Sequence, residues 1–174
     1  MAGGQVAQVG AQMMLNHLLG NAAPVVSATA PAIPVPGQWW INTSSGNSVN
    51  QYNGTAWVVD SGNRYLALLT ADPTLLPAVL ISDLAEVTTP GYSRQLVTWS
   101  DASSAYPSVS DNSGNVTWGP FTANMAVGTQ WVALVTAASG LTGLLLYTWT
   151  VGLQQVNTSE SIQLAATEFT LAQA

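Results

Sequence analysis

The sequence contains no cysteine and no lysine, and its 174 residues include two arginines and eight acidic residues. Charged residues form 6% of the chain, against about 25% in an ordinary globular domain. Without cysteine the chain can form no disulfide, iron–sulfur or zinc-thiolate site. A single histidine, His17, excludes metal sites that need two histidines from one chain. We therefore expect neither a metal nor a cofactor.

The scarcity of cations also restricts the possible partners. Nucleic-acid binding requires lysines and arginines that neutralise phosphates, and attachment to an anionic membrane has the same requirement. A chain with two arginines and a formal net charge of −6 cannot meet it. No apolar run reaches the roughly 18 residues of a membrane span, and the N-terminus lacks the basic segment of a signal peptide. We expect neither a nucleic acid nor a membrane as partner.

No set of residues indicates catalysis. A nucleophilic serine needs a neighbouring base, but His17 lies far in sequence from most of the chain, and the G-x-S-x-G elbow is absent. Paired carboxylates could serve a glycosidase. However, the acidic residues near the turns, such as Asp101 and Asp111, are typical of turn-stabilising side chains. The expected protein is not an enzyme.

The order of patterns along the chain predicts four regions. Residues 1–20 should form a helix, because Ala7, Ala11, Met14, Leu15 and Leu18 fall on one helical face. Residues 21–37 are rich in proline and should form an extended arm. Residues 38–62 should form a small β-meander. Residues 63–174 should form the main β domain.

The predicted meander combines turn signals with aromatic residues. Short strands are expected at 39–41, 48–52 and 55–59, with turns at 44–47 and at Asn53-Gly54, a strong hairpin signal. Trp39, Trp40 and Trp57 could pack together, anchor an interface or form a sugar-binding platform, and packing is the favoured interpretation.

The remainder alternates between short apolar runs and clusters of Ser, Gly, Asn, Asp and Pro, with no helical period between them. This pattern predicts a mainly β protein with an antiparallel β-sandwich or jelly roll. The segment from 72 to 86 could form one short helix or cover a sheet edge. The expected strands lie at 64–70, 92–100, 115–121, 130–136, 144–151, 161–165 and 168–172.

The two cations, Arg64 and Arg94, stand among many acids. Each could form a structural salt bridge, with Asp72 or Glu86 as candidate partners, or pair with a neighbouring subunit and fix the register of an oligomer. Under either alternative both arginines are unusually important.

Several short runs resemble motifs of a family of small structural proteins of tailed bacteriophages. The match covers Met14–Gly20 and most of Arg64–Ala174. The sequence departs from the family from Asn21 to Asn63, because the family's helix runs almost directly into its YLAL strand. The runs are Met14–Gly20, Arg64–Thr74, Glu86 with Gly91–Trp99, Asn115–Trp118, Gln130–Gly140 and Ser161–Leu171. Members of that family are virion, tail-fibre-like or head-associated proteins.

This resemblance implies a virion structural protein and no catalytic residue. The leading hypothesis is a capsid decoration (cement) protein, a homo-oligomer and most concretely a trimer, which binds the major capsid protein or other virion proteins at the head surface. The alternatives are a tail or neck fibre component and, in another class, a carbohydrate-binding module. The expected interface residues are Met14, Leu15, Leu18, Trp39, Trp40, Trp57, Arg64 and Arg94.

Overall fold

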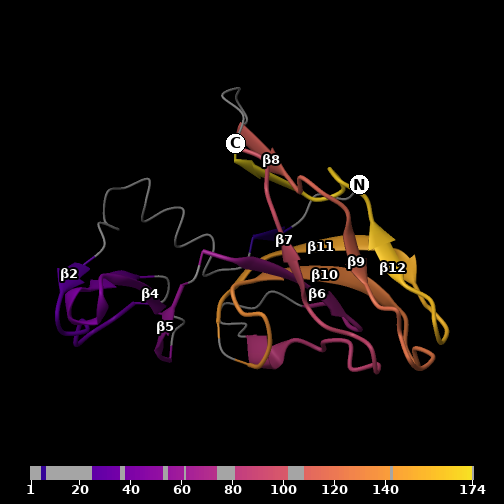
Figure 1. Cartoon of the computed structure of the whole chain (residues 1–174), viewed down its shortest axis with the longest axis horizontal. Coiled ribbons are helices and arrows are strands. Elements are labelled where there is room, and N and C mark those ends of the chain that lie inside the picture. Colours follow the sequence, from indigo (N-terminus) through magenta and orange to yellow (C-terminus); the bar gives the residue numbers. More distant parts are fainter. Residues whose placement is uncertain are drawn as a thin grey trace.

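The computed structural model describes residues 5–6, 25–35, 38–52, 55–60, 62–73, 81–101, 108–141 and 143–173. The protein is mainly β, with antiparallel sheets as predicted (Figure 1). Its largest sheet has five strands in the order β1 (Gln5–Val6), β11 (Leu145–Gln154), β10 (Thr129–Val135), β6 (Arg64–Leu69) and β7 (Gln95–Val97). All neighbours in this sheet are antiparallel.

The central strands of this sheet are buried on both faces. On one face Leu66 and Leu68 of β6 lie in a core with Val132 and Leu134 of β10. The alternate residues, including Ala67 and Leu69 of β6, belong to a second core that Ile81 completes from outside the sheet. A strand that is buried on both faces has no polar side to alternate with, and this explains why these strands are continuous apolar runs in the sequence.

A second β layer covers the first face. It consists of two antiparallel pairs, β9 (Val116–Trp118) with β12 (Ile162–Leu164) and β8 (Ser108–Asp111) with β13 (Thr170–Gln173). Trp118, Ile162 and Phe169, each at most 2% exposed, bring this layer into the core of Leu66 and Leu68. Two β layers around a shared core make the β-sandwich that the sequence predicts.

One buried amide connects the two strand pairs of this layer. Asn112 is fully buried, and its side chain donates to the carbonyls of Gly114 and Ala165 at 2.9 Å each. Its Oδ1 accepts a bond of 2.8 Å from the backbone N–H of Phe169. Both amide donors and the amide oxygen are thus satisfied without water, as the burial of such a group requires.

A separate four-stranded sheet precedes the sandwich and lies to one side of it in Figure 1. It contains β2 (Val25–Ser27), β3 (Trp39–Asn42), β4 (Ser48–Tyr52) and β5 (Trp57–Val59). The three strands expected for the meander are confirmed, and the first turn contains the 3₁₀ segment η1 (Thr43–Ser45). The expected Asn53-Gly54 turn lies outside the described residues.

Strand β2 comes from the stretch predicted as an extended arm, and it pairs in parallel with β3. Extended backbone was expected there, but its partner was not, because β2 and β3 are neither an adjacent hairpin nor linked by a crossover helix. The small sheet therefore takes in part of the proline-rich stretch.

The helix predicted for residues 1–20 is wrong at Gln5 and Val6, which form β1 and pair with Thr148 and Tyr147 of β11. A sheet partner distant in sequence overrides local helical pattern at these two positions. The remaining residues of that prediction lie outside the described ranges. Among the described residues, no helix has the length and apolar character needed to cross a membrane.

For residues 72–86 the sequence allowed one short helix or cover for a sheet edge. Residues 74–80 lie outside the described part of the chain, and the end of this segment lies along a sheet edge. The 3₁₀ segment η2 (Ile81–Asp83) places Ile81 in the second core. Beyond it, the backbone N–H of Thr70 donates to the Ala85 carbonyl, and that of Val87 donates to the Leu68 carbonyl. Residues 85–87 thus continue the edge of β6 where β7 no longer reaches it.

Candidate interface surfaces and the buried arginine

One face of the small sheet holds a cluster of aromatic rings. The strand register puts Trp40, Tyr52 and Trp57 on this face. The centroids of Trp40 and Trp57 lie 5.5 Å apart with an interplanar angle of 66°, and Tyr52 contacts Trp57 at the same distance. Trp40 is 8% exposed, and its Nε1 donates to the Ser27 carbonyl. Edge-to-face rings with a satisfied indole N–H are typical of a packed core, which supports the packing interpretation.

The opposite face of the small sheet is aliphatic at one end. Val26, Ile41 and Val49 stand directly opposite one another on β2, β3 and β4. Val26 is 62% exposed and Val49 37% exposed. Trp39 also lies on this face, half-buried, opposite Gln51. The three tryptophans that the sequence grouped together are therefore divided between the two faces. We call the row of Val26, Ile41 and Val49 the aliphatic face.

Arg64 is paired at the junction between the small sheet and the sandwich. Its guanidinium donates to both carboxylate oxygens of Asp60, at 2.9 and 3.1 Å. Asp60 also accepts from the backbone N–H of Gly62. The Asp60 side chain is 4% exposed and that of Arg64 is 22% exposed. The salt bridge is thus local and intramolecular, and its acid is neither of the two candidates named from the sequence.

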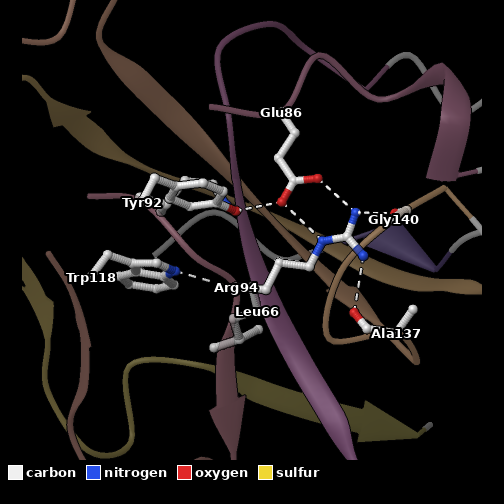
Figure 2. A network of polar contacts seen from close by, with 8 residues as sticks. Leu66, Glu86, Tyr92, Arg94, Trp118, Ala137 and Gly140 are labelled. Atoms are coloured by element: carbon white, nitrogen blue, oxygen red, sulfur yellow. Dashed lines mark hydrogen bonds and ion pairs between the residues drawn. The ribbon is translucent and has the colours of Figure 1, made fainter. Parts of the chain in front are cut away.

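Arg94 forms the most extensive polar network of the sandwich (Figure 2). Its Nε and Nη2 donate to the two carboxylate oxygens of Glu86, at 2.9 and 2.7 Å. The same guanidinium donates to the carbonyls of Ala137 and Gly140, at 2.9 Å each. The Arg94 side chain is 3% exposed. The expected pairing with Glu86 is confirmed for this arginine, and the two extra bonds hold the β10–β11 loop against the edge of the sheet.

Tyr92 completes this network from the other side of Glu86. Its hydroxyl donates to Glu86 Oε1 at 2.7 Å and accepts from the backbone N–H of Leu68 at 3.1 Å. That N–H lies on the edge of β6, between the part of the edge that pairs with β7 and the part along which residues 85–87 lie. The tyrosine hydroxyl therefore accepts a bond that no neighbouring strand accepts. Burial, followed by the hydrogen bond to Glu86, raises the pKa of Tyr92 well above its ordinary value.

The acidic side chains near the turns also hold backbone and hydroxyl groups. Asp111 accepts from the Thr170 hydroxyl at 2.6 Å, and Glu160 accepts from the backbone N–H of Asn157 at 2.7 Å. Within the described ranges, no three His, Asp or Glu side chains gather as a metal site would require. These contacts are structural in kind. The Glu160 bond lies within a turn, as expected of acids near the turns, whereas Asp111 ends β8 and its bond reaches across to Thr170 of β13.

The structure brings together only some of the residues expected at an interface. Trp40 and Trp57 are in contact, whereas Trp39, Arg64 and Arg94 each lie in different surroundings. Their role at an interface stays a prediction. The other three expected residues lie outside the described part of the chain: Met14, Leu15 and Leu18.

Sequence reasoning missed Asn112 and Tyr92 as organising residues. The signal that could have indicated Tyr92 was its place two residues from Arg94, one of only two cations. Asn112 carries no such signal, because it stands in a stretch rich in serine and asparagine.

The chain matches a protein-family model over residues 40–172, which is more than half of its length. The family is described as podophage GP4 fiber I protein gp80. No curated protein sequence matches the chain. The match begins at Trp40, so it includes most of the Trp-rich sheet, which the resemblance described above leaves out.

Proposed function

Because the chain belongs to the family of the podophage GP4 fiber I protein gp80, we propose that it is a fibre component of a phage particle. The chain is a bacteriophage virion structural protein. The family match over residues 40–172 carries the proposal and favours the fibre alternative over the capsid decoration protein that led the sequence analysis. In this proposal the protein lies in the virion, with the tail favoured over the head surface.

The proposed role is mechanical, without catalysis. Several charged groups of the described residues are engaged in holding the fold: Glu86 and Arg94 bind each other, and Asp111 binds Thr170. A sandwich whose edge and loop are fixed in this way is a stiff unit, as a fibre requires. Its partners in this proposal are other virion proteins, bound through neutral surfaces.

Immunogold electron microscopy of purified phage tests the location. Antibody raised against the sandwich should label fibres at the tail or neck and leave the capsid surface unlabelled. Particles that lack the protein serve as the control for antibody specificity. Gold distributed over the head would contradict the proposal.

A thermal assay separates the fibre and cement roles by a second route. Particles with and without the protein are heated, and DNA release is followed with an intercalating dye. A fibre component should leave the release temperature unchanged. A lower release temperature in the particles without it would restore the cement hypothesis.

A further inference from the structure

The small sheet and the sandwich are packed separately. Within the described part of the chain, strands β2 to β5 pair only with one another, and the aromatic cluster packs inside the small sheet. Neither hydrophobic core of the sandwich contains a described residue from 25–59. Two units that share no large apolar interface are expected to move relative to each other unless another contact holds them. The link between them is therefore where their angle is set.

The two charged residues of this link are fixed by different sheets. Asp60 follows β5, and its backbone N–H donates to the Val49 carbonyl of β4 at 2.9 Å. Arg64 begins β6 and pairs with Val97 of β7. The ion pair between Asp60 and Arg64 is thus a connection between the small sheet and the sandwich.

The Asp60 carboxylate organises the link around itself. It accepts two bonds from the Arg64 guanidinium, at 2.9 and 3.1 Å, and one from the backbone N–H of Gly62 at 2.9 Å. The same guanidinium donates to the Asn63 carbonyl at 2.8 Å. Gly62 has a φ of +77°, in the left-handed region. A bidentate arginine–carboxylate pair fixes orientation as well as distance, so this pair restrains the conformation of the whole link.

We propose that the Asp60–Arg64 pair is a latch that holds the small sheet at one angle to the sandwich. Hinges are a few loop or element-terminal residues that absorb changes in φ and ψ, and this link joins the end of β5 to the start of β6. With the latch closed, the small sheet projects in one direction. With the latch removed, the link turns and the small sheet samples several directions. The inference depends on the link alone and not on where the protein lies in the particle.

Distances between spin labels on the two units test the latch in the full chain. Because the sequence has no cysteine, V26C on the small sheet and L153C on the sandwich provide the only two thiols for nitroxide labels. Val26 and Leu153 are 62% and 63% exposed, so both sites tolerate a label. Labelled chain is diluted with unlabelled chain, so that double electron–electron resonance measures distances within one chain. The chain with its latch intact should give one narrow distance distribution.

The double variant D60N/R64M removes the ion pair without leaving a buried charge unpaired, and its amide oxygen can still accept from the Gly62 N–H. The distance distribution of V26C/L153C should broaden at least about twofold in this variant, because the link then turns as a hinge. R64K keeps the positive charge but loses the bidentate geometry, so it should broaden the distribution less.

A matched control places both labels on the sandwich. Leu96 is 55% exposed, and L96C/L153C should give the same narrow distribution with and without the latch. A broad distribution for this pair identifies a variant whose sandwich has unfolded. Should D60N/R64M lose its fold, R64K carries the same comparison.

Two results would overturn the proposal. The first is a V26C/L153C distribution that is as narrow in the folded latch variants as in the chain with its latch intact. The second is a broad distribution in the chain with its latch intact, while L96C/L153C stays narrow. Neither result changes the outcome of the gold-labelling test.

Discussion

Replacing Arg94 with methionine keeps most of the side-chain volume and removes every donor of the buried network. Four hydrogen bonds are lost, two to Glu86 and one each to the carbonyls of Ala137 and Gly140. Breaking a buried ion pair by removing one partner costs about 3–5 kcal/mol. The lower end applies to the pair, because the Glu86 side chain is 21% exposed and keeps its bond from Tyr92. The loss of the hydrogen bond to each of the two carbonyls adds at most about 1 kcal/mol.

The expected loss for R94M is therefore about 3–5 kcal/mol in the free energy of unfolding, measured by urea titration with tryptophan fluorescence. R64M is the matched control. Its side chain is 22% exposed and its bridge to Asp60 is local. That variant leaves the buried Asp60 carboxylate with its bond from Gly62, and it should lose about 3 kcal/mol, the lower end of the range for a broken buried pair, because no contact between distant segments is lost with it.

The double variant R94M/E86Q tests the cause. If the cost comes from an uncompensated carboxylate, removing that charge should recover part of it, and the two substitutions should not be additive. A loss below about 1 kcal/mol in R94M would refute the reasoning that this network holds the loop and the sheet edge together.

Three further substitutions test other parts of the sandwich. Y92F should lose about 1–3 kcal/mol in urea unfolding, because the Leu68 N–H is left without an acceptor. The pKa of Tyr92 is raised by burial, so above about pH 10 the unfolded chain releases a proton that the folded chain retains, and stability should fall by up to about 1.4 kcal/mol per pH unit. In Y92F this alkaline decline should be smaller, and an unchanged slope would contradict the assignment. N112D cannot donate to the Gly114 and Ala165 carbonyls as a carboxylate, and its melting temperature should drop most at neutral pH and recover as the acid protonates. G91A should lower the melting temperature strongly, because its φ is +93° and a Cβ would lie 2.6 Å from the Pro120 carbonyl oxygen, whereas G114A has open space and should change it little.

The strands that the sequence predicts best are those with continuous apolar runs. β6 and β10 lie within a residue of their expected positions, since residues 65–69 and 131–135 are all apolar. β8 was missed because its Ser-Val-Ser-Asp run resembles the turns around it. β2 was missed because its parallel partner lies beyond a proline-rich connection. Pairing across a long connection is a tertiary effect that no local pattern carries.

The importance of Arg94 could be inferred from its rarity, and Glu86 could be named among its partners. The two carbonyl partners could not, because Ala137 and Gly140 lie more than forty residues further along the chain. Both partners fall inside motifs on which the phage resemblance rests. The network thus joins three of the runs that carry the resemblance, through Leu68, through Glu86 with Tyr92 and Arg94, and through Ala137 with Gly140.

The positions of the few charged residues give the low charge of the chain a structural explanation. Both arginines bind carboxylates of their own chain, so neither offers its charge to an acidic partner without breaking an internal salt bridge. The acids that remain exposed lie on the sandwich, and the small sheet carries none of them. Exposed acids and the uncharged strands of the small sheet thus occupy separate regions of the described chain.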